Sequence, residues 1–505
     1  MDGRRRIVRQ DTNDSEVHTG GSLDIRSVRA SALRIAAMTP HRRHALGART
    51  IACNISTWAL VLISTCIVAP LTALGQGASS ESGIPARSIA TNFPDDRRKA
   101  LATQGITYEL NYVGELQSNV SGGVSRGVTY IGRLEGIVDV DLAKLAGWQG
   151  LAFHANGYQI HGDGLSRDHV ANLMTVSYIE ALATTRLSEL WLEQKVLGGK
   201  VGFRFGQLAA DTEFNTSSYA TQFINSTFGW PAILAANLPS GGPAYPLATP
   251  GVRLKVDPDK NVSLLLGVYN GDSAGPGEGD PQTRNRYGLN FRVQDPALIM
   301  AEGQYRYNQD KGAKGLAGTV KLGAWGHWGR FDDQRFDTSG LSLADPASTG
   351  NPAGRRGNQG VYSVIDQQIW RPATGEPDKG VGVFARASGN PADRNRIDLY
   401  IDGGIVFAGL IPGRPEDVLS FGGAYARVSS RARGLDADAA AFSGGGIIRD
   451  FEALFEANYQ FQVLPGLQID LDLQRIIHPG GNVAGPGGAA IPDATVLTLH
   501  TFIRY

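Results

Sequence analysis

Residues 451–474 read FEALFEANYQFQVLPGLQIDLDLQ, and this stretch decides the fold class. In its first half, aromatic side chains such as Phe455 and Tyr459 alternate with polar ones such as Glu456 and Gln460. In its second half, Leu and Ile alternate with Asp and Gln in the same way. Successive side chains of a β-strand point to opposite faces, so this period of two predicts two strands, each with one apolar and one polar face. The Pro-Gly pair between them predicts a short turn and an antiparallel hairpin.

The same alternation returns along the chain beyond residue 100, where no helical period is sustained. Clear runs occur at residues 106–117, 128–141, 286–293, 467–474 and 497–505. Short turns alternate with long connections rich in Gly and Pro, at residues 209–250, 329–360, 428–448 and 475–493. We count about seventeen candidate strands, and a bacterial single-chain barrel closes with an even number. The pattern therefore predicts an all-β protein, a transmembrane antiparallel β-barrel of sixteen strands.

The polar face of these runs separates a membrane barrel from a soluble β-sandwich. A sandwich exposes this face to bulk water and fills it with Lys, Glu and Thr, whereas here it carries mainly Arg, Asp and Glu. The opposite face is aromatic and aliphatic, as contact with lipid requires, and the chain ends on an alternating run whose last residue is Tyr505. The alternative is a secreted β-sandwich lectin or adhesin, in which the aromatic face is buried between two sheets.

The composition excludes several classes of protein. Lys and Arg number 48, and Asp and Glu also number 48, so the chain lacks the basic excess that a nucleic-acid-binding protein needs. Only two cysteines are present, Cys53 and Cys66, too few for a disulfide scaffold or a zinc site made of thiolates. The nine histidines are scattered along the chain, and we expect no metal site.

The start of the chain has the pattern of an exported protein. Residues 1–50 are rich in arginine, and residues 50–80 carry no charged side chain. A basic flank, an apolar core and a small-residue site are typical of a signal peptide, and we expect translation to start at Met38 and cleavage to follow Gly75. The alternative is a transmembrane anchor, because the uncharged stretch is long enough to span a bilayer.

Three parts of the chain are therefore expected. Residues 1–75 are the N-terminal extension with the signal peptide. Residues 76–104 are a periplasmic lead-in or plug. Residues 105–505 are the barrel in the bacterial outer membrane, with a constriction loop at residues 209–250.

A set of short motifs occurs between residues 199 and 256. In order, they are Gly202-Phe203-Arg204-Phe205-Gly206-Gln207, Glu213-Phe214, Phe223-Ile224-Asn225-Ser226-Thr227-Phe228-Gly229, Tyr245-Pro246-Leu247-Ala248 and Pro250-Gly251-Val252-Arg253-Leu254. Flanking matches are Leu190-Trp191-Leu192-Glu193-Gln194 and Gly267-Val268-Tyr269-Asn270-Gly271-Asp272. In order and spacing, this set resembles the carbohydrate-selective outer-membrane porins of the OprB type, and the resemblance extends over residues 104–505.

The resemblance implies a sixteen-stranded barrel that passes sugars by facilitated diffusion, as a monomer or a trimer. It implies no ATP, no redox cofactor and no covalent chemistry. The partners would be the permeating sugars, the outer-membrane lipid and the barrel assembly machinery, which reads a C-terminal strand such as the one ending at Tyr505. The basic extension at residues 1–50 and the insert at residues 329–360 depart from the family pattern.

The connection at residues 209–250 is the expected constriction of the pore. It is too long for a plain hairpin loop, and loops of this length are usually functional or disordered. Its aromatic content predicts a packed loop that folds inward and narrows the barrel; the aromatic residues are Phe214, Tyr219, Phe223, Phe228, Trp230 and Tyr245. We expect the three phenylalanines to pack on the wall, and Trp230 to be either a stacking platform for a sugar ring or a packing residue.

A selective sugar channel needs hydrogen-bonding groups at close range. Arg presents a planar fork of donors, and carboxylates accept hydrogen bonds from hydroxyls. Strand parity puts four charged residues on the lumen side, and the full set of candidates for contact with the sugar is Arg133, Glu135, Arg204, Arg253, Glu109, Glu115 and Trp230. The alternative for each charged residue is that it solvates the wall or pairs with a neighbour across the strands.

Two other functions would use the same architecture or residues. A general or ion-selective porin has the same barrel, and the sequence separates it poorly from a sugar channel. A glycoside hydrolase needs two carboxylates across the sugar, for which Glu452 with Glu456 and Asp470 with Asp472 are candidates. Both pairs lie on regular alternating runs, where a row of lumen-facing side chains explains them, so an enzyme is disfavoured.

Overall fold

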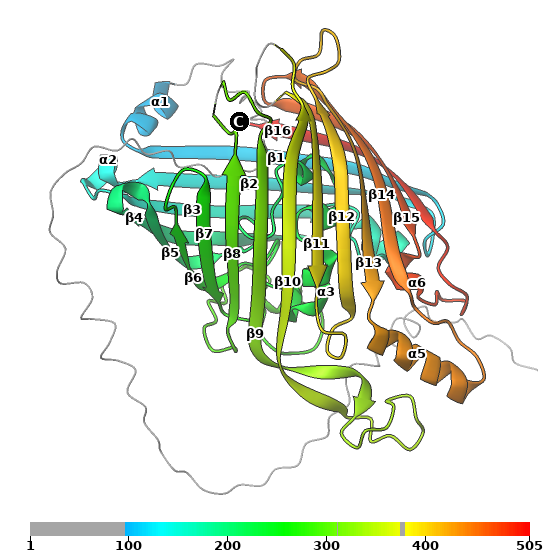
Figure 1. Ribbon diagram of the computed structural model, residues 1–505. Coiled ribbons are helices and arrows are strands. Elements are labelled where there is room, and N and C mark those ends of the chain that lie inside the picture. The colour runs from blue at the N-terminus through cyan, green and yellow to red at the C-terminus, as the bar shows by residue number, and fades with distance from the viewer. Residues whose placement is uncertain (1–95, 311, 374–378) are drawn as a thin grey trace, which may run out of the picture. The chain divides into compact units, whose positions relative to one another are not determined.

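The computed structural model describes residues 96–505, except residue 311 and residues 374–378 (Figure 1). The expected signal peptide, its cleavage after Gly75, the start at Met38 and the membrane-anchor alternative all lie outside the described residues. They remain predictions.

Sixteen strands close into one barrel. Each strand pairs antiparallel with its neighbours in the sequence, and β1 pairs with β16 to close the wall. The strands are β1 (Ile106–Ser121), β2 (Gly127–Asp141), β3 (Leu151–Gly162), β4 (Thr184–Val196), β5 (Val201–Leu208), β6 (Thr249–Val256), β7 (Val262–Tyr269), β8 (Leu298–Tyr307), β9 (Gly318–Asp337), β10 (Pro352–Trp370), β11 (Gly380–Gly389), β12 (Ile397–Ala408), β13 (Val418–Val428), β14 (Phe451–Leu464), β15 (Leu467–Ile477) and β16 (Ala494–Arg504). The predicted strand number and antiparallel order are confirmed.

Short helical segments lie between the strands, and in the described part of the chain no helix is long and apolar enough to cross a bilayer. They are α1 (Asp96–Thr103), α2 (Leu142–Ala146), η3 (Ser166–Val170), η4 (Leu197–Gly199), η5 (Ala220–Gln222), η6 (Ser226–Phe228), α3 (Ala232–Asn237), η7 (Pro239–Gly241), α4 (Pro281–Arg284), α5 (Ser430–Ser443) and α6 (Pro479–Asn482). Helix α1 is the described part of the expected lead-in. Its Arg98 donates hydrogen bonds to the carbonyl oxygens of Tyr108 (3.1 Å) and Tyr505 (3.4 Å), so α1 contacts the seam where the barrel closes.

Because neighbouring strands are antiparallel, their connections alternate between two ends of the barrel. At one end, which we call the turn end, lie residues 142–150, 197–200, 257–261, 308–310, 312–317, 371–373, 379, 409–417 and 465–466. At the other, the loop end, lie residues 122–126, 163–183, 209–248, 270–297, 338–351, 390–396, 429–450 and 478–493. The turn end also holds α1 and the C-terminus (Figure 1). Short turns at one end and longer loops at the other are typical of outer-membrane barrels.

The two faces of the wall follow the predicted alternation. On β14 and β15, Phe455 and Leu471 point outward, and each is 59% exposed. Their neighbours Glu456 and Asp472 point inward and are buried. The polar face is therefore the lumen face, and the apolar face is the one that meets lipid.

One predicted strand is wrong. Residues 286–293 form no strand and belong to the connection between β7 and β8, with Leu289 and Val293 exposed. The carbonyl oxygen of Tyr287 accepts a hydrogen bond from the amide of Leu187 on β4 (3.0 Å), where β4 extends past the end of β5. Arg286 and Tyr287 lie in a turn, and Gly288 has a φ of 68°, so this run alternates in sequence without the backbone of a strand. The period alone does not separate the two cases.

The expected long connection at residues 329–360 is also wrong over most of its length. Strands β9 and β10 continue through it and leave only residues 338–351 as the connection between them. They project as a hairpin beyond their neighbours, close to α5 (Figure 1), and Arg335 forms an ion pair with Asp438 of α5 (2.8 Å). The hairpin has no apolar face along this part, so the alternation that marks the barrel strands is missing from its sequence.

A charge on the outward face of the wall should be costly. We expect Leu471→Arg, in the middle of β15, to lower the free energy of unfolding by about 2–4 kcal/mol, because the Arg would face hydrocarbon. Leu197→Arg is the control: Leu197 is exposed in the turn after β4, and the cost near the interface is about 0–1 kcal/mol. Chemical denaturation in lipid vesicles measures both, and equal losses would contradict this placement of the wall.

Candidate functional site

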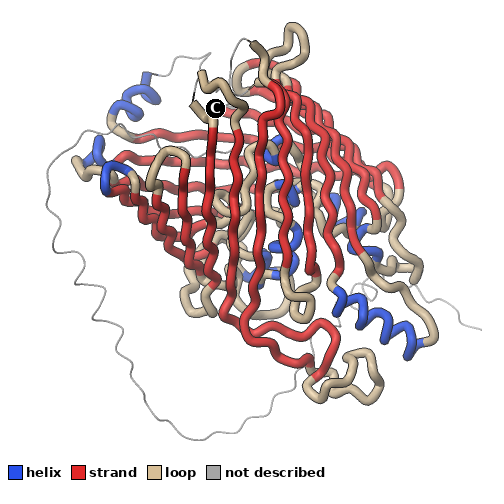
Figure 2. The backbone as a smooth tube through the Cα atoms, viewed as in Figure 1, coloured by secondary structure: helices blue, strands red, loops and turns tan. Residues whose placement is uncertain are grey.

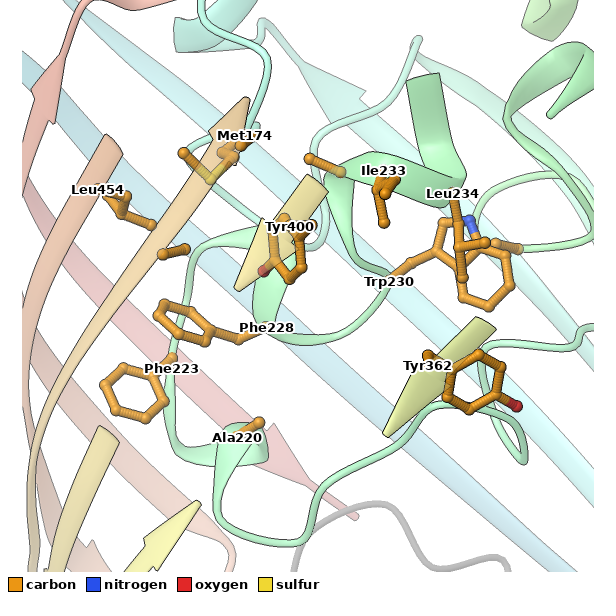
Figure 3. Close-up of a cluster of buried hydrophobic side chains, with 14 of the residues drawn as sticks. Met174, Ala220, Phe223, Phe228, Trp230, Ile233, Leu234, Tyr362, Tyr400 and Leu454 are labelled. Atoms are coloured by element: carbon orange, nitrogen blue, oxygen red, sulfur yellow. The ribbon is translucent and has the colours of Figure 1, made fainter. Parts of the chain in front are cut away.

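The connection between β5 and β6, residues 209–248, folds back inside the barrel, and we call it the inner loop. Its helical turns are visible between the strands in Figure 2. The rings of Phe223 and Phe228 stack 4.4 Å apart and pack with inward-facing wall residues such as Tyr400 (Figure 3). Gly422 on β13 makes this possible, because a Cβ at that position would lie 2.7 Å from the ring of Phe223. The inner loop is therefore packed, as its aromatic content predicts.

Wall carboxylates hold the backbone of the inner loop from the inside. Glu456 on β14 accepts from the amides of Ile224 (2.6 Å) and Asn225 (3.2 Å). Glu302 on β8 accepts from the amide of Asn215 (2.8 Å), and Asp366 on β10 accepts from the hydroxyl of Ser217 and the amide of Ser218 (3.0 Å). Buried backbone amides need hydrogen-bond partners, and a loop inside a barrel has no sheet of its own to supply them.

Cations on the same wall hold the carbonyl oxygens of the inner loop. Arg386 on β11 is fully buried and paired with Asp402 on β12. Its guanidinium also donates to the carbonyl oxygens of Asn215 (2.9 Å) and Thr227 (2.9 Å). Lys321 on β9 donates to the carbonyl oxygen of Thr216 (2.6 Å). These anchors lie on β8 to β14, and β4 adds two more, since Arg186 donates to the carbonyl oxygen of Pro246 (2.8 Å) and Glu189 accepts from the amide of Ala209 (3.0 Å).

The connection between β3 and β4, residues 163–183, is held in the same way, and we call it the second inner loop. Glu452 on β14 accepts from the amides of Leu173 and Met174, each at 2.7 Å. The amide of Tyr178 donates to the carbonyl oxygen of Ile224 (2.9 Å), which joins the two loops. Glu452 and Glu456 are thus occupied by loop amides, which accounts for both carboxylates without a hydrolytic role.

The opposite side of the wall carries a cluster of two Arg and two Glu side chains. Arg253 on β6 donates to Glu193 on β4 (3.0 Å) and forms a bidentate pair with Glu213 of the inner loop (2.7 Å for both contacts). Arg204 on β5 lies 3.3 Å from Glu193 and 3.6 Å from Glu213. Its guanidinium lies 3.7 Å from the ring centre of Trp191, which fixes the group by a cation–π contact. We call these four charged residues the Arg–Glu cluster.

A second group surrounds Arg133 on β2. The guanidinium lies 3.5 Å from Glu135 and between 4.9 and 5.5 Å from the ring centres of Tyr158, Tyr178 and Tyr245. Tyr245 belongs to the inner loop, and burial raises the pKa of its phenol above the ordinary value, so the hydroxyl stays protonated. Arg133 is thus held in a cage of polar aromatic rings.

The other candidates from the sequence have structural partners elsewhere. Glu109 pairs with Arg504 near the turn end (2.7 Å), and Glu115 is fully buried against His500 (3.0 Å). Trp230 is 9% exposed, and its indole N–H donates within the inner loop, which favours the packing role over a stacking platform. Among the described residues, no group of three or more His, Cys, Asp or Glu side chains could hold a metal ion.

The sequence reasoning missed Glu193, Glu213 and Trp191 as members of the site. The signal for Glu193 was available, because the short turn at residues 197–200 sets the hairpin register that puts Glu193 opposite Arg204. Glu213 could not be placed, since its position depends on how the inner loop crosses the barrel.

Arg386→Leu should release the inner loop. Asp402 would then be buried without its cation, and breaking a buried ion pair costs about 3–5 kcal/mol. We expect that loss in the free energy of unfolding, together with protease cleavage of the folded barrel within residues 209–248. The control is Arg475→Leu, whose pair with Asp493 is 45% exposed at Arg475 and 34% at Asp493 and should contribute about 0–1 kcal/mol. Equal losses and an uncleaved loop would contradict the anchoring role.

Comparison with known proteins agrees with this architecture. The family described as "Carbohydrate-selective porin, OprB family" matches residues 125–505. Porin B of Pseudomonas aeruginosa is 25% identical over 410 residues, which cover 76% of this chain and 86% of that protein. The high-pH structure of Pseudomonas putida OprB is 21% identical, with a TM-score of 0.72, and the match covers 84% of this chain and 99% of that one. Its low-pH structure matches with a TM-score of 0.50 at 17% identity.

The family match spans most of the described barrel and includes the Arg–Glu cluster, the Arg133 cage and the inner loop. Members of this family are porins, so the family match argues against the hydrolase and lectin alternatives. The chain belongs to the OprB family of carbohydrate-selective outer-membrane porins.

Proposed function

We propose that neutral mono- or small oligosaccharides cross this barrel by facilitated diffusion along the side formed by β2 to β6, past Arg133 and Glu135 and in direct contact with Arg204 of the Arg–Glu cluster, where Arg253 is a positioning residue. The observation that carries the proposal is the charge balance of the Arg–Glu cluster, in which two guanidinium groups share two carboxylates. Such a cluster offers many hydrogen-bonding groups and little net field.

The charge balance favours a neutral permeant over an ion. Ion-selective pores present rings of one charge sign, which attract the counter-ion and repel the co-ion. Here each positive group has a carboxylate within 3.6 Å, so the cluster favours neither sign. A sugar hydroxyl both donates and accepts, and it can exchange with either partner of an Arg–Glu pair.

The two arginines of the cluster take different roles. The side chain of Arg253 is only 2% exposed and is held by three charge-assisted hydrogen bonds, so it positions the two glutamates. The side chain of Arg204 is 15% exposed, and we assign it the direct contact with the sugar. Binding at such a site stays weak, as conduction requires, because the sugar competes with partners that are already present.

The same proposal includes the setting of the channel. The turn end faces the periplasm and the loop end the outside, as in other outer-membrane barrels. A cleaved signal peptide delivers the chain, lipid surrounds the apolar face, and the assembly machinery reads the last strand. Support for the last step is that Tyr505, the residue after β16, lies beside β1, where its amide donates to the carbonyl oxygen of Leu110 (2.8 Å).

Arg204→Ala should remove sugar selectivity while keeping the barrel. We expect glucose uptake in a liposome-swelling assay to fall about tenfold, the effect of losing one charge-assisted hydrogen bond. Uptake of a zwitterionic amino acid of similar size should change little, because the pore is not narrowed.

Lys195→Ala is the matched control, since it removes a positive charge from an exposed side chain at the turn end of β4. It should leave both rates as in the wild type. If the wild-type protein passes sugars and amino acids according to size alone, the barrel is a general porin and the proposal fails.

A further inference from the structure

The projecting hairpin of β9 and β10 carries four arginines, and two of them are unpaired. The four are Arg330, Arg335, Arg355 and Arg356. Arg335 forms an ion pair with Asp438, and Arg355 forms one with Asp333. Arg330 and Arg356 are exposed, and neither guanidinium forms an ion pair or a hydrogen bond within the described part of the chain. We call these two residues the arginine pair.

The fold holds the arginine pair side by side. Arg330 and Arg356 are direct partners in the β9–β10 ladder, so their side chains leave the same face of the hairpin. Arg394 of the next connection donates to the carbonyl oxygens of Arg356 (3.0 Å) and Gly357 (2.8 Å), which fixes the backbone there. Like charges directly opposite each other destabilise a strand pair. Two opposed cations without a carboxylate therefore favour an anion from outside the chain.

The arginine pair lies on the outer face of the wall. His327 on β9 is buried on the lumen side, and its ring contacts that of Phe331 (5.1 Å between ring centres). Trp328 and Arg330 alternate with these two residues and so face outward. Trp328 is 64% exposed, and aromatic residues on the outer face mark the membrane interface. Two residues along a strand span about 7 Å, which places the pair at the level of the lipid headgroups.

The surroundings of the arginine pair indicate the chemistry of the anion. Arg presents a fork of donors that matches phosphate, and two such forks can hold one phosphate group. On the membrane side of Trp328, the outer face is apolar, with Leu322 and Val361 exposed, and it can contact acyl chains. Asp332 shares the same face, two residues farther along β9 from Trp328, and it leaves the charge of the three groups positive.

We propose that the arginine pair binds the phosphorylated headgroup of a lipid in the outer leaflet of the membrane. The headgroup phosphate lies between Arg330 and Arg356, and the acyl chains lie along the wall below Trp328. The inference goes beyond the passage of sugars, and it shares with the proposed function only the orientation that puts the loop end outside.

The test is lipid binding to the refolded protein in detergent, measured by native mass spectrometry. The probe is diphosphoryl lipid A, a glycolipid with two phosphate groups, and the comparison is the same lipid after dephosphorylation. Arg330→Gln and Arg356→Gln should each raise the dissociation constant of the phosphorylated lipid about tenfold, the effect of losing a hydrogen bond to a charged group. The weaker binding of the dephosphorylated lipid should be the same in all forms of the protein.

Arg126→Gln is the matched control. Arg126 is exposed at the loop end, between β1 and β2, and it also lacks an ion pair among the described residues, but no second arginine lies opposite it. Its replacement removes the same charge from the same end of the barrel and should leave the binding of both lipids as in the wild type.

Thermal unfolding separates a lost site from a folding defect. Without lipid, Arg330→Gln and Arg356→Gln should melt no lower than the wild type, because each relieves a repulsion between like charges. With phosphorylated lipid in excess, the wild type should gain more stability than either variant, because only a ligand bound to the folded state raises the melting temperature. Lower melting of both variants without lipid would contradict the opposed placement of the two cations.

Two results would overturn the lipid site. One is a dissociation constant of the phosphorylated lipid that is equal in the wild type and in both variants. The other is displacement of the lipid by inorganic phosphate at the same concentration, which would make the pair a site for free phosphate. Glucose uptake into liposomes should be equal in the wild type and in both variants, so failure of this inference and failure of the proposed function give different results.

Discussion

The structure depends on one constraint, the need to pair the backbone of loops that lie inside a closed wall. Every amide and carbonyl group of a strand pairs with a neighbouring strand, but a loop in the lumen has no such neighbour. The inward-facing carboxylates on β8, β10 and β14 supply acceptors, and Arg386 and Lys321 supply donors. The polar face of the wall therefore lines the lumen and also supplies hydrogen-bond donors and acceptors for specific loop residues.

This constraint divides the charged residues of the lumen into two groups. On β8 to β14 they are consumed by the inner loop and the second inner loop, and their pairing fixes how the loops cross the barrel. On β2 to β6 some pair with one another or with aromatic rings, as in the Arg–Glu cluster and around Arg133. Others on these strands also hold the inner loop: Arg186 donates to the carbonyl oxygen of Pro246, and Glu189 accepts from the amide of Ala209. Because Glu213 of the inner loop belongs to the Arg–Glu cluster, the anchoring of the constriction and the chemistry of selection meet at this cluster.

The period of two was sufficient to predict the barrel and the lumen face, and the rule that such barrels have an even number of strands reduced the count of about seventeen runs to sixteen. It put Arg133, Arg204 and Arg253 inside, and Glu456 and Asp472 with them, because side-chain direction along a strand depends only on parity. It failed at residues 286–293, where a connection beside β4 alternates in sequence but forms a turn and a bend, and at residues 329–360, where paired strands leave the barrel and lose their apolar face. Local pattern carries no information on whether a segment pairs with a neighbouring strand.

The candidate site was predicted only in part, for a related reason. The position of a residue in the alternation along a strand indicates that its side chain faces the lumen, but it does not indicate which residue that side chain contacts there. Glu115 and Glu109 have that parity and are occupied by His500 and Arg504, whereas Glu193 was overlooked although the register of a short hairpin brings it to Arg204. The place of Trp230 depends on the path of the inner loop, which is set by contacts far apart in the sequence.

The central claim is that the inner loop stays fastened inside the barrel while sugars pass. A disulfide between the loop and the wall tests it, made by Gln222→Cys and Ser420→Cys in a chain with Cys53 and Cys66 replaced by serine. The hydroxyl of Ser420 donates to the carbonyl oxygen of Gln222 (3.2 Å), so the two positions are adjacent. Glucose uptake into liposomes is then compared between the oxidised and reduced forms. The account predicts equal rates, and uptake that is lost on oxidation and restored on reduction would show that permeation needs the loop to leave the wall.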